Sequence, residues 1–281
     1  MGFGNKKLYK SPAELRLMVR PGLLTAAALS AVRSAIAPGV TTMQLDAIAE
    51  AVIRDGGGAP NFMKEPGYFH TICSSVNDEI VHGIPGARVI VPGDLVSIDC
   101  GAEVHGWNGD AAFSVVVPDP AQQVRVAQRQ QLSDATECSL WAGIAALASA
   151  RKLNEVGAAI EDSLDGAEFG GVRFGIIEDY TGHGIGRSMH EDPPVFNYRV
   201  RGASPDVRPG LVVAIEPMVT SGGIESHVLA DDWTVATDDG LDAAHWEHSV
   251  AVHSEGIWVL TAADGGAEAL APLGVVPAPI P

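Results

Sequence analysis

The sequence predicts an α+β fold made of two similar halves. Apolar residues recur at helical spacing in four stretches: 11–36, 42–56, 121–152 and 153–164. Short strands follow the second and the fourth of these stretches. In each half a Pro-Gly pair precedes an apolar run that ends in an acid, Asp99 or Glu216, seven residues after the proline. The equal offset indicates internal duplication of one unit of two helices and following strands.

The first two helices have recognisable boundaries. Residues 11–14, Ser-Pro-Ala-Glu, combine a capping hydroxyl, a proline at the first helical position and an acid three residues after the cap. We expect Pro21-Gly22 to kink or fray this helix, and Pro38-Gly39 to end it. Thr42 is expected to cap the second helix, and the glycines at 56–58 to close it.

The strands of the first half are expected at 76–81, 88–91, 95–99 and 111–117, with a turn-rich stretch at 101–109. The chain is therefore predicted to hold one domain over 11–260, divided into halves of about 11–118 and 121–260. Residues 1–10 are expected to form an N-terminal extension. The segment 261–281 is rich in Gly, Pro and small residues and is expected to be a flexible tail.

Composition excludes several classes of function. The chain has 281 residues, of which 46% are hydrophobic and 19% charged, an ordinary globular balance. Its 35 acidic and 18 basic residues give a net charge of −17, which argues against nucleic-acid and anionic-lipid partners. It contains no uninterrupted apolar run of spanning length and no secretory signal. Three scattered cysteines form no disulfide framework, so a reducing cytoplasm is the expected setting.

Two acids of the first half are candidates for metal chemistry. Asp99 ends an apolar run, where an unpaired carboxylate is costly. If the following turn is centred between Val104 and His105, Asp110 directly faces Asp99 across a hairpin. Two opposed carboxylates repel each other and need a metal or a shared proton. For either acid by itself, a role as a loop cap would be the better explanation.

The second half repeats this arrangement. Glu216 lies at the end of an apolar run, and Glu247 begins a strand whose partner is expected at 233–237, across the turn 238–240. Four acids at the strand ends of two related halves are expected to converge. Hard oxygen ligands with one nitrogen are typical of Mn, Fe(II), Co or Mg sites rather than of structural zinc.

The candidate nitrogen ligand lies in the glycine-rich stretch 180–193. Glycines on both sides of His183 allow close backbone approach and leave the imidazole accessible, and His190 follows seven residues later. A single loop histidine is more often solvated than ligating, but four acids elsewhere in the chain favour a metal site. A phosphate-binding loop is disfavoured because the glycine spacing and the lysine of such loops are missing.

Four runs carry a resemblance to a known family: HGIGRSMHEDP, NDEIVHGIPG, DLVSIDCG and WTVATDDGLDAAHWEHSVAV. Together they resemble the type I methionine aminopeptidases, which are pita-bread metallopeptidases. The resemblance covers about 11–260 and implies two pseudo-symmetric halves of two helices and two strands, with a central curved antiparallel sheet and helices outside.

The resemblance implies a site with two divalent metal ions, which are Mn, Co, Fe(II) or Zn. Asp99, Asp110, His183, Glu216 and Glu247 match the five ligands. Asp110 and Glu247 would bridge the two ions. Asp99 would bind one ion, and His183 with Glu216 would bind the other.

Other positions match residues that contact substrate. His82 and His190 match two active-site histidines that are not ligands. The expected pocket for the methionine side chain is formed by Phe62, Tyr68, Cys73, Met189 and Trp233. Two departures from the family concern this pocket, because Met189 replaces an aromatic residue of many bacterial relatives and Glu65 lies close to the pocket.

The implied activity is removal of the N-terminal methionine from nascent chains and peptides with a small second residue. Glu216 would transfer a proton to the leaving amine. His190 would donate to the scissile carbonyl, and His82 would contact the departing nitrogen. The expected partners are N-termini of nascent polypeptides at the ribosome, and the expected state is a monomer.

Two alternatives remain open. A proline-specific aminopeptidase or dipeptidase would use the same fold and ligands, although such chains usually carry an additional N-terminal domain. A non-enzymatic interaction protein of this fold would be expected to lack ligands, and some such proteins have basic surfaces. The full set of acids and the net charge of −17 disfavour the second alternative.

Overall fold

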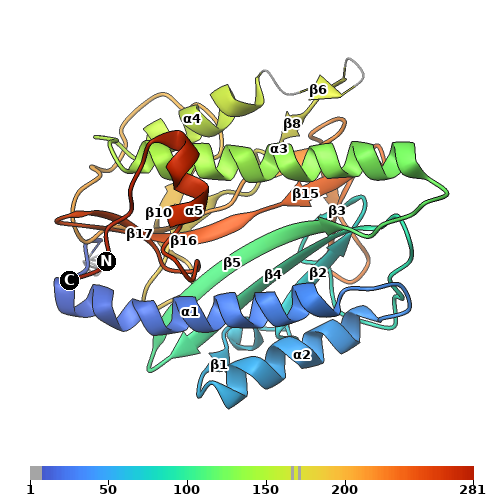
Figure 1. The fold of residues 1–281 in the computed structure, drawn as a ribbon, viewed down its shortest axis with the longest axis horizontal. Helices are drawn as coiled ribbons and strands as arrows, with labels where there is room; N and C mark the ends of the chain where they lie inside the picture. The colour runs from blue at the N-terminus through green and yellow to red at the C-terminus, as the bar shows by residue number, and fades with distance from the viewer. Residues whose placement is uncertain (1–7, 166–167, 170–171) are drawn as a thin grey trace.

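A nine-stranded antiparallel sheet forms the centre of the computed structural model, which describes residues 8–165, 168–169 and 172–281. Its main path runs β1-β4-β5-β16-β11-β9-β10, with β2 beside β4 and β17 beside β16. The main helices are α1 (Pro12–Ala35), α2 (Thr42–Asp55), α3 (Gln123–Leu147) and α4 (Asn154–Leu164). Helices α1 and α2 lie outside the first half, and α3 and α4 lie outside the second (Figure 1). The predicted α+β pita-bread architecture is confirmed.

The sheets contain the following strands. The first half has β1 (Ala59–Pro60), β2 (Ile72–Val76), β3 (Glu79–Val81), β4 (Leu95–Val104) and β5 (Trp107–Val116). The second half has β6 (Glu168–Phe169), β7 (Val172–Arg173), β8 (Gly175–Ile176), β9 (Gly182–Gly184), β10 (Glu191–Val195), β11 (Val212–Ile215), β12 (Met218–Thr220), β13 (Ser226–Val228), β14 (Val235–Thr237), β15 (Ala243–His245), β16 (Glu247–His253) and β17 (Gly256–Val259). Short sheets β15-β12-β8, β13-β14-β3 and β6-β7 complete the described fold.

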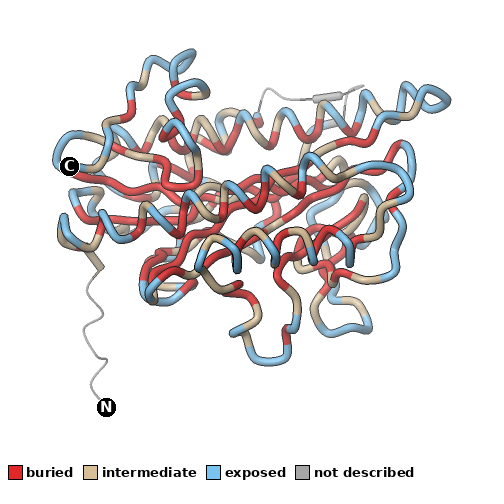
Figure 2. The backbone as a smooth tube through the Cα atoms, turned by 60° about the horizontal axis from the view of Figure 1, so that its bottom comes forward, coloured by how far each residue is buried: buried red, intermediate tan, exposed pale blue. Residues whose placement is uncertain are grey.

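The core fills the space between the helices and the central sheet. Figure 2 shows that the buried residues follow the strands and the helix faces turned toward them. The main cluster joins Val32 and Leu45 of the first helix pair to Ile144 and Ile160 of the second. One continuous apolar layer therefore holds both halves together, since strand side chains of β4, β5, β11 and β16 belong to the same cluster.

The helix starts agree closely with the sequence patterns. Ser11 accepts a hydrogen bond from the Glu14 amide and the Glu14 carboxylate accepts one from the Ser11 amide, which forms a capping box. The second helix is capped by Thr41, one residue before the expected Thr42, with Gln44 as its partner. Helix α1 runs without interruption through Pro21, so the expected fraying is not observed.

Three expected strand boundaries were wrong. Residues 76–81 form the end of β2, a turn and β3 instead of one strand, because Asn77 has a left-handed φ of 66° and the two strands belong to different sheets. In the stretch 88–91, Val89 makes only an isolated bridge, to Thr41. The stretch 101–109 is mostly strand, because its turn needs only His105 and Gly106, both with positive φ.

The C-terminal segment is packed rather than loose. It contains the short helix α5 (Ala267–Leu270) and a 3-10 turn at Ala271–Leu273, and Leu270 is fully buried. Farther along, the Ala278 amide donates to the Ile257 carbonyl. A buried leucine and a backbone hydrogen bond to β17 thus help to hold a segment whose composition indicated disorder. Of the expected N-terminal extension, residues 1–7 lie outside the described residues, and Lys10 is ion-paired with Glu191 at 3.0 Å.

By length and composition, helix α1 is long and apolar enough to cross a membrane. However, 44% of its apolar 18-residue stretch is buried within the structure. Its buried face includes Met18, Ala28 and Val32. That face lies against β4 and β5. The helix therefore has the position of a core helix in a folded domain.

The two Pro-Gly pairs occupy equivalent places in the two halves. Gly93 and Gly210 have φ values of 89° and 100°, and each opens the turn that leads into a central strand, β4 or β11. Both turns use a left-handed glycine, which few other residues would tolerate. The structure thus repeats the pattern that indicated internal duplication.

Close packing of α1 on the strands gives a stability prediction. A Cβ on Gly22 would lie 2.4 Å from the carbonyl oxygen of Leu260, so backbone would have to move. We expect Gly22→Ala to lower the free energy of unfolding by about 1–3 kcal/mol. Helix propensity alone predicts the opposite, a gain of about 1 kcal/mol. Urea unfolding decides between them, with Gly86→Ala as the control because its nearest atom would lie at 3.9 Å.

Candidate metal centre and substrate pocket

The β4–β5 hairpin places the first two acids on one face of the sheet. Asp99 is paired with Ala112, and Asp110 with Gly101, so the two acids are diagonal neighbours and not directly opposed. The turn lies one residue later than the one assumed from the sequence. This changes the pairing by two residues, which preserves the face because side chains alternate with a period of two.

Strand β16 brings the acids of the second half to this position. Glu247 is its first residue and is paired with Ala112 of β5. Glu216 follows directly after β11, whose last residue, Ile215, is paired with His248. The partner expected for Glu247 was wrong, because β14 pairs with β13 and β3 instead. Pairing of β16 with both β5 and β11 joins the two halves at the acids.

Backbone contacts fix Asp110 in this arrangement. Its amide donates to Ser249 Oγ at 3.1 Å, and Ser249 Oγ donates to the Asp110 carbonyl at 2.8 Å. Ser249 lies two residues after Glu247 on β16. The hydroxyl thus ties the two strands that carry Asp110 and Glu247, and leaves both carboxylates free to face the site.

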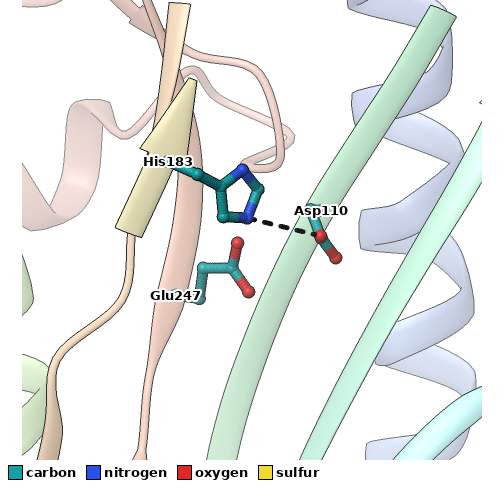
Figure 3. Close-up of side chains that lie close together, drawn as sticks. All are labelled: Asp110, His183 and Glu247. Carbon is teal, nitrogen blue, oxygen red and sulfur yellow. Dashed lines mark ion pairs between the residues drawn. The ribbon is translucent and has the colours of Figure 1, made fainter. Parts of the chain in front are cut away.

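His183 supplies a nitrogen toward the acids. Strand β9 is paired with β11, which brings His183 Nε2 to 3.4 Å from Glu216 Oε1 and 4.0 Å from Asp110 Oδ2. Figure 3 shows its ring directed at Asp110 and Glu247. Its Nδ1 lies 3.0 Å from the Gly184 carbonyl oxygen, which can only accept a hydrogen bond. The proton therefore belongs on Nδ1, and Nε2 presents a free electron pair.

Orphaned oxygens test whether this site fits a cation. Asp99 Oδ1, Asp110 Oδ1 and Glu247 Oε1 are buried and have no hydrogen-bond partner among the described residues. Burying such atoms without a partner is costly, and a divalent cation would satisfy all three. One donor atom each from Asp110, His183 and Glu247 lies within 4.8 Å of the others. The residues therefore fit a divalent metal ion.

Burial and mutual repulsion control the protonation of the acids. Burial raises the pKa of Asp99 to about 7, although the nearby His245 lowers it in part, and burial raises the pKa of Glu216 to about 7. Burial also raises the pKa values of Asp110 and Glu247 well above their usual range, and neighbouring carboxylates add to this effect. Without a cation these acids hold protons near neutral pH, and a bound cation would take the place of those protons.

His245 was missed in the sequence analysis. It is 2% exposed, and its Nε2 lies 3.7 Å from Glu216 Oε2. Glu216, His245 and Glu247 form a second group of donor atoms within 4.8 Å of one another. The available signal was spacing, because His245 and Glu247 are two residues apart and extended backbone places such residues on one face.

The predicted pocket residues come together beside the acids. Phe62, Tyr68, Cys73 and Met189 form a buried cluster, with Trp233 packed against it. The rings of Tyr68 and Trp233 are 5.0 Å apart, and those of Phe62 and Tyr68 are 6.4 Å apart. Tyr68 donates to the Ile72 carbonyl at 2.7 Å, which leaves an apolar ring face toward the cavity.

This pocket opens directly onto the acids. Cys73 of β2 is paired with Asp99 of β4, so the pocket wall and the candidate ligand belong to neighbouring strands. Glu65 also lines the cavity, as the departure from the family pattern indicated. The cavity therefore has a soft apolar end, a carboxylate on its wall and the acid cluster at its base.

The two remaining histidines flank the cavity. His82 has a left-handed φ of 61°, and its ring lies 6.4 Å from that of Trp233. Burial lowers the pKa of His82 to about 4, so this imidazole is neutral at pH 7. His190 is exposed, and its ring lies 4.5 Å from the ring of His183. Both can contact a substrate that reaches the acids.

The raised pKa values predict how stability depends on pH. With a folded pKa of about 7 and an unfolded value of about 4, Asp99 and Glu216 hold protons that the unfolded chain releases. Metal-free protein should therefore lose stability as pH rises from about 4 to about 7. Saturating Mn²⁺ or Co²⁺ should raise the melting temperature by about 5–10 °C at pH 8 and by less at pH 5.

Thermal unfolding with and without EDTA measures this effect. Asp110→Asn serves as the matched variant, because it removes one charge from the cluster at nearly constant shape. It should reduce the metal-dependent shift at pH 8. Equal metal-dependent shifts at pH 5 and pH 8 would contradict the assignment of protons to the acid cluster.

Comparison with known proteins agrees with this geometry. Residues 16–254 match the model of metallopeptidase family M24. The chain is 49% identical over 256 residues to methionine aminopeptidase 1 of Mycobacterium tuberculosis, covering 90% of this chain and 94% of that protein. It also matches the crystal structure of methionine aminopeptidase from Thermotoga maritima, with a TM-score of 0.82, 34% identity, and coverage of 90% and 98%.

More distant structures share the fold alone. Prolidase from Pyrococcus furiosus matches with a TM-score of 0.68 and 18% identity, covering 91% of this chain and 66% of that one. The match with the family model extends over both halves of the sheet and includes every acid of the cluster. This chain therefore belongs to metallopeptidase family M24.

Proposed function

We propose that this protein is a methionine aminopeptidase, a metallo-exopeptidase that removes the N-terminal methionine from peptides with a small second residue. The observation that carries the proposal is that the acid cluster and the apolar pocket adjoin each other. A cluster of buried acids with unpaired oxygens lies at the base of an apolar pocket lined by Tyr68, Met189 and Trp233. The names of the relatives support the same activity.

Five residues would hold two divalent ions. Asp110 and Glu247 lie centrally and would bridge the ions, with Asp99 on one side and His183 with Glu216 on the other. Two divalent ions held in this way supply a nucleophile at neutral pH and stabilise the developing oxyanion. Mn, Co, Fe(II) and Zn all accept ligand sets of carboxylate and imidazole.

The protein's own groups would move protons and orient the peptide. Glu216 lines the cavity and would carry a proton to the leaving nitrogen. His190 lies at the exposed side, where its N–H would donate to the scissile carbonyl oxygen. His82, neutral at pH 7, would accept or donate a hydrogen bond at the departing peptide nitrogen.

The position of Asp99 explains cleavage at the chain terminus. Because Asp99 is paired with Cys73, a side chain seated in the pocket would bring its own α-amino group close to this acid. A peptide extended before that residue would have to occupy the space at the base of the pocket. The cavity would therefore select a free N-terminus.

The expected substrates are the N-termini of nascent polypeptides, met at the ribosome by a cytoplasmic, monomeric enzyme. The net charge of −17 disfavours direct binding to ribosomal RNA, so contact with a nascent chain would depend on the exposed N-terminus itself. A proline-specific peptidase is the second candidate, and its support is the shared fold of the prolidases.

Replacement of His190 tests its assignment. His190→Ala should lower kcat by about 10²–10³, the usual effect of removing one oxyanion donor. Metal content measured by elemental analysis should stay at the wild-type value. His227→Ala is the control, because His227 is an exposed histidine paired with Asp238. Loss of metal from the His190 variant would make it a ligand instead.

Peptide cleavage tests the proposed function. Metal-free protein should cleave Met-Ala-Ser after addition of Mn²⁺ or Co²⁺ and should leave an Ala-Pro peptide intact. Norleucine in place of methionine should change the activation free energy by no more than about 1–3 kcal/mol, because an apolar pocket discriminates weakly between similar side chains. Bulky second residues should be rejected.

Other substrate preferences would show which part of the proposed function is wrong. A tenfold preference for Leu or Ala over Met would exclude the methionine assignment and leave the metallopeptidase assignment intact. Cleavage of Ala-Pro alone would favour the proline-specific alternative. Because Glu65 lines the cavity, the same peptides should be measured with Glu65→Tyr, which places an aromatic ring on this wall. Its preference for Met should equal or exceed that of the wild type.

A further inference from the structure

The backbone of His245 is fixed in place from both sides. It ends β15, where it is paired with Met218 of β12. Its amide donates to Ser114 Oγ at 3.0 Å, and Ser114 Oγ donates to its carbonyl oxygen at 2.9 Å. Ser249 Oγ holds the backbone of Asp110 in the same way, by accepting from its amide and donating to its carbonyl; we call each such contact a serine clamp. The imidazole therefore projects from a rigid position.

The side chain of His245 has no ordinary structural role. It is 2% exposed, and its Nε2 is buried without a hydrogen-bond partner among the described residues. Glu216 Oε2 lies 3.7 Å away, which exceeds the usual 2.7–3.2 Å range of an N–H···O hydrogen bond. A buried imidazole nitrogen that faces carboxylates without bonding to them is an orphaned donor atom.

The carboxylate of Glu216 lies between two imidazoles. His183 Nε2 is 3.4 Å from Oε1, and His245 Nε2 is 3.7 Å from Oε2. Each histidine also belongs to a separate group of three donor atoms, and the two groups share only Glu247. The site thus has a nitrogen on each side of Glu216.

The spacing of the second group suits a metal ion. Its donor atoms, from Glu216, His245 and Glu247, all lie within 4.8 Å of one another. Nitrogen and oxygen ligands lie about 2.0–2.2 Å from an ion, so two of them on one ion are at most about 4.4 Å apart. Small side-chain movements would bring all three to one cation.

We propose that His245 is an additional metal ligand, which donates Nε2 to the ion that His183 does not hold, with Glu216 presenting Oε1 toward His183 and Oε2 toward His245. This inference rests on the proposed two-ion site and adds a sixth ligand to the five carried by the family resemblance. Each ion would then have one imidazole, from His183 or from His245.

A second imidazole has a consequence for metal selectivity. Imidazole nitrogen suits Zn, Fe and Co, whereas carboxylate and water suit Mn and Mg. The site that includes His245 should therefore bind Co²⁺ or Zn²⁺ more tightly, relative to Mn²⁺, than an all-oxygen site would. Removal of the imidazole should reduce Co²⁺ affinity more than Mn²⁺ affinity.

Proton NMR of the Co²⁺-loaded protein counts the imidazole ligands directly. Each coordinated histidine contributes a strongly shifted ring N–H signal that disappears in D₂O. His245 is buried, so its N–H should exchange slowly enough to be seen. We expect wild-type protein to show such a signal for His183 and another for His245. His245→Gln should lose one of them, and His248→Gln should keep both.

The control is matched to the test variant. His248 is next to Glu247, but its Nδ1 contacts Thr261 Oγ1 at 2.8 Å and its ring packs on Trp141. Calorimetric titration of the metal-free proteins gives the affinities. His245→Gln should bind Co²⁺ at its weaker site at least about tenfold less tightly, since even partners outside the ligand shell are worth 10–100-fold. The loss for Mn²⁺ should be smaller.

The outcomes separate this proposal from the proposed function. A single shifted N–H signal in the wild type, with two Co²⁺ ions bound, would overturn the role of His245 and leave the two-ion peptidase intact. Unchanged Co²⁺ affinity in folded His245→Gln would also overturn it. Absence of any bound Co²⁺ in the wild type would overturn both proposals. If His245→Gln does not fold, the wild-type spectrum still decides.

Discussion

The burial of like charges at the centre of the sheet is the constraint on which the structure depends. Asp110 and Glu247 are 3% and 2% exposed, and each has an oxygen without a partner among the described residues. The fold can hold them only with bound protons or with a cation. The extensive core and the serine clamps are the surroundings that keep these groups in place despite their repulsion.

Much of this arrangement could be predicted from the sequence. It depends on local sequence patterns and on whether a shift in strand pairing is even or odd. Capping boxes, the alternation of helices and strands, and the repeated Pro-Gly offset are local signals. The positions of Asp99 and Asp110 on one face survived a wrong estimate of the turn, since the pairing changed by an even number of residues. An odd change would have moved one acid to the opposite face.

The errors arose where long-range contacts decide the structure. Nothing local to 233–237 indicates that this strand pairs with β3, far away in the sequence, rather than with the strand of Glu247. The C-terminal segment resembles a disordered chain until Leu270 meets the core. His245 was overlooked because the family pattern names five ligands, although its spacing of two residues from Glu247 was an available signal.

One pair of strands, β2 and β4, contributes both to the substrate pocket and to the acid cluster. Cys73 lines the pocket from β2, and directly opposite it Asp99 faces the acids from β4. At this wall of the pocket, backbone hydrogen bonds between β2 and β4 fix the distance to the candidate ligands. The remaining adaptability belongs to Met189, whose thioether can adjust to the seated side chain. Rigid strands set the distance to the cation, and a soft wall accepts the residue to be removed.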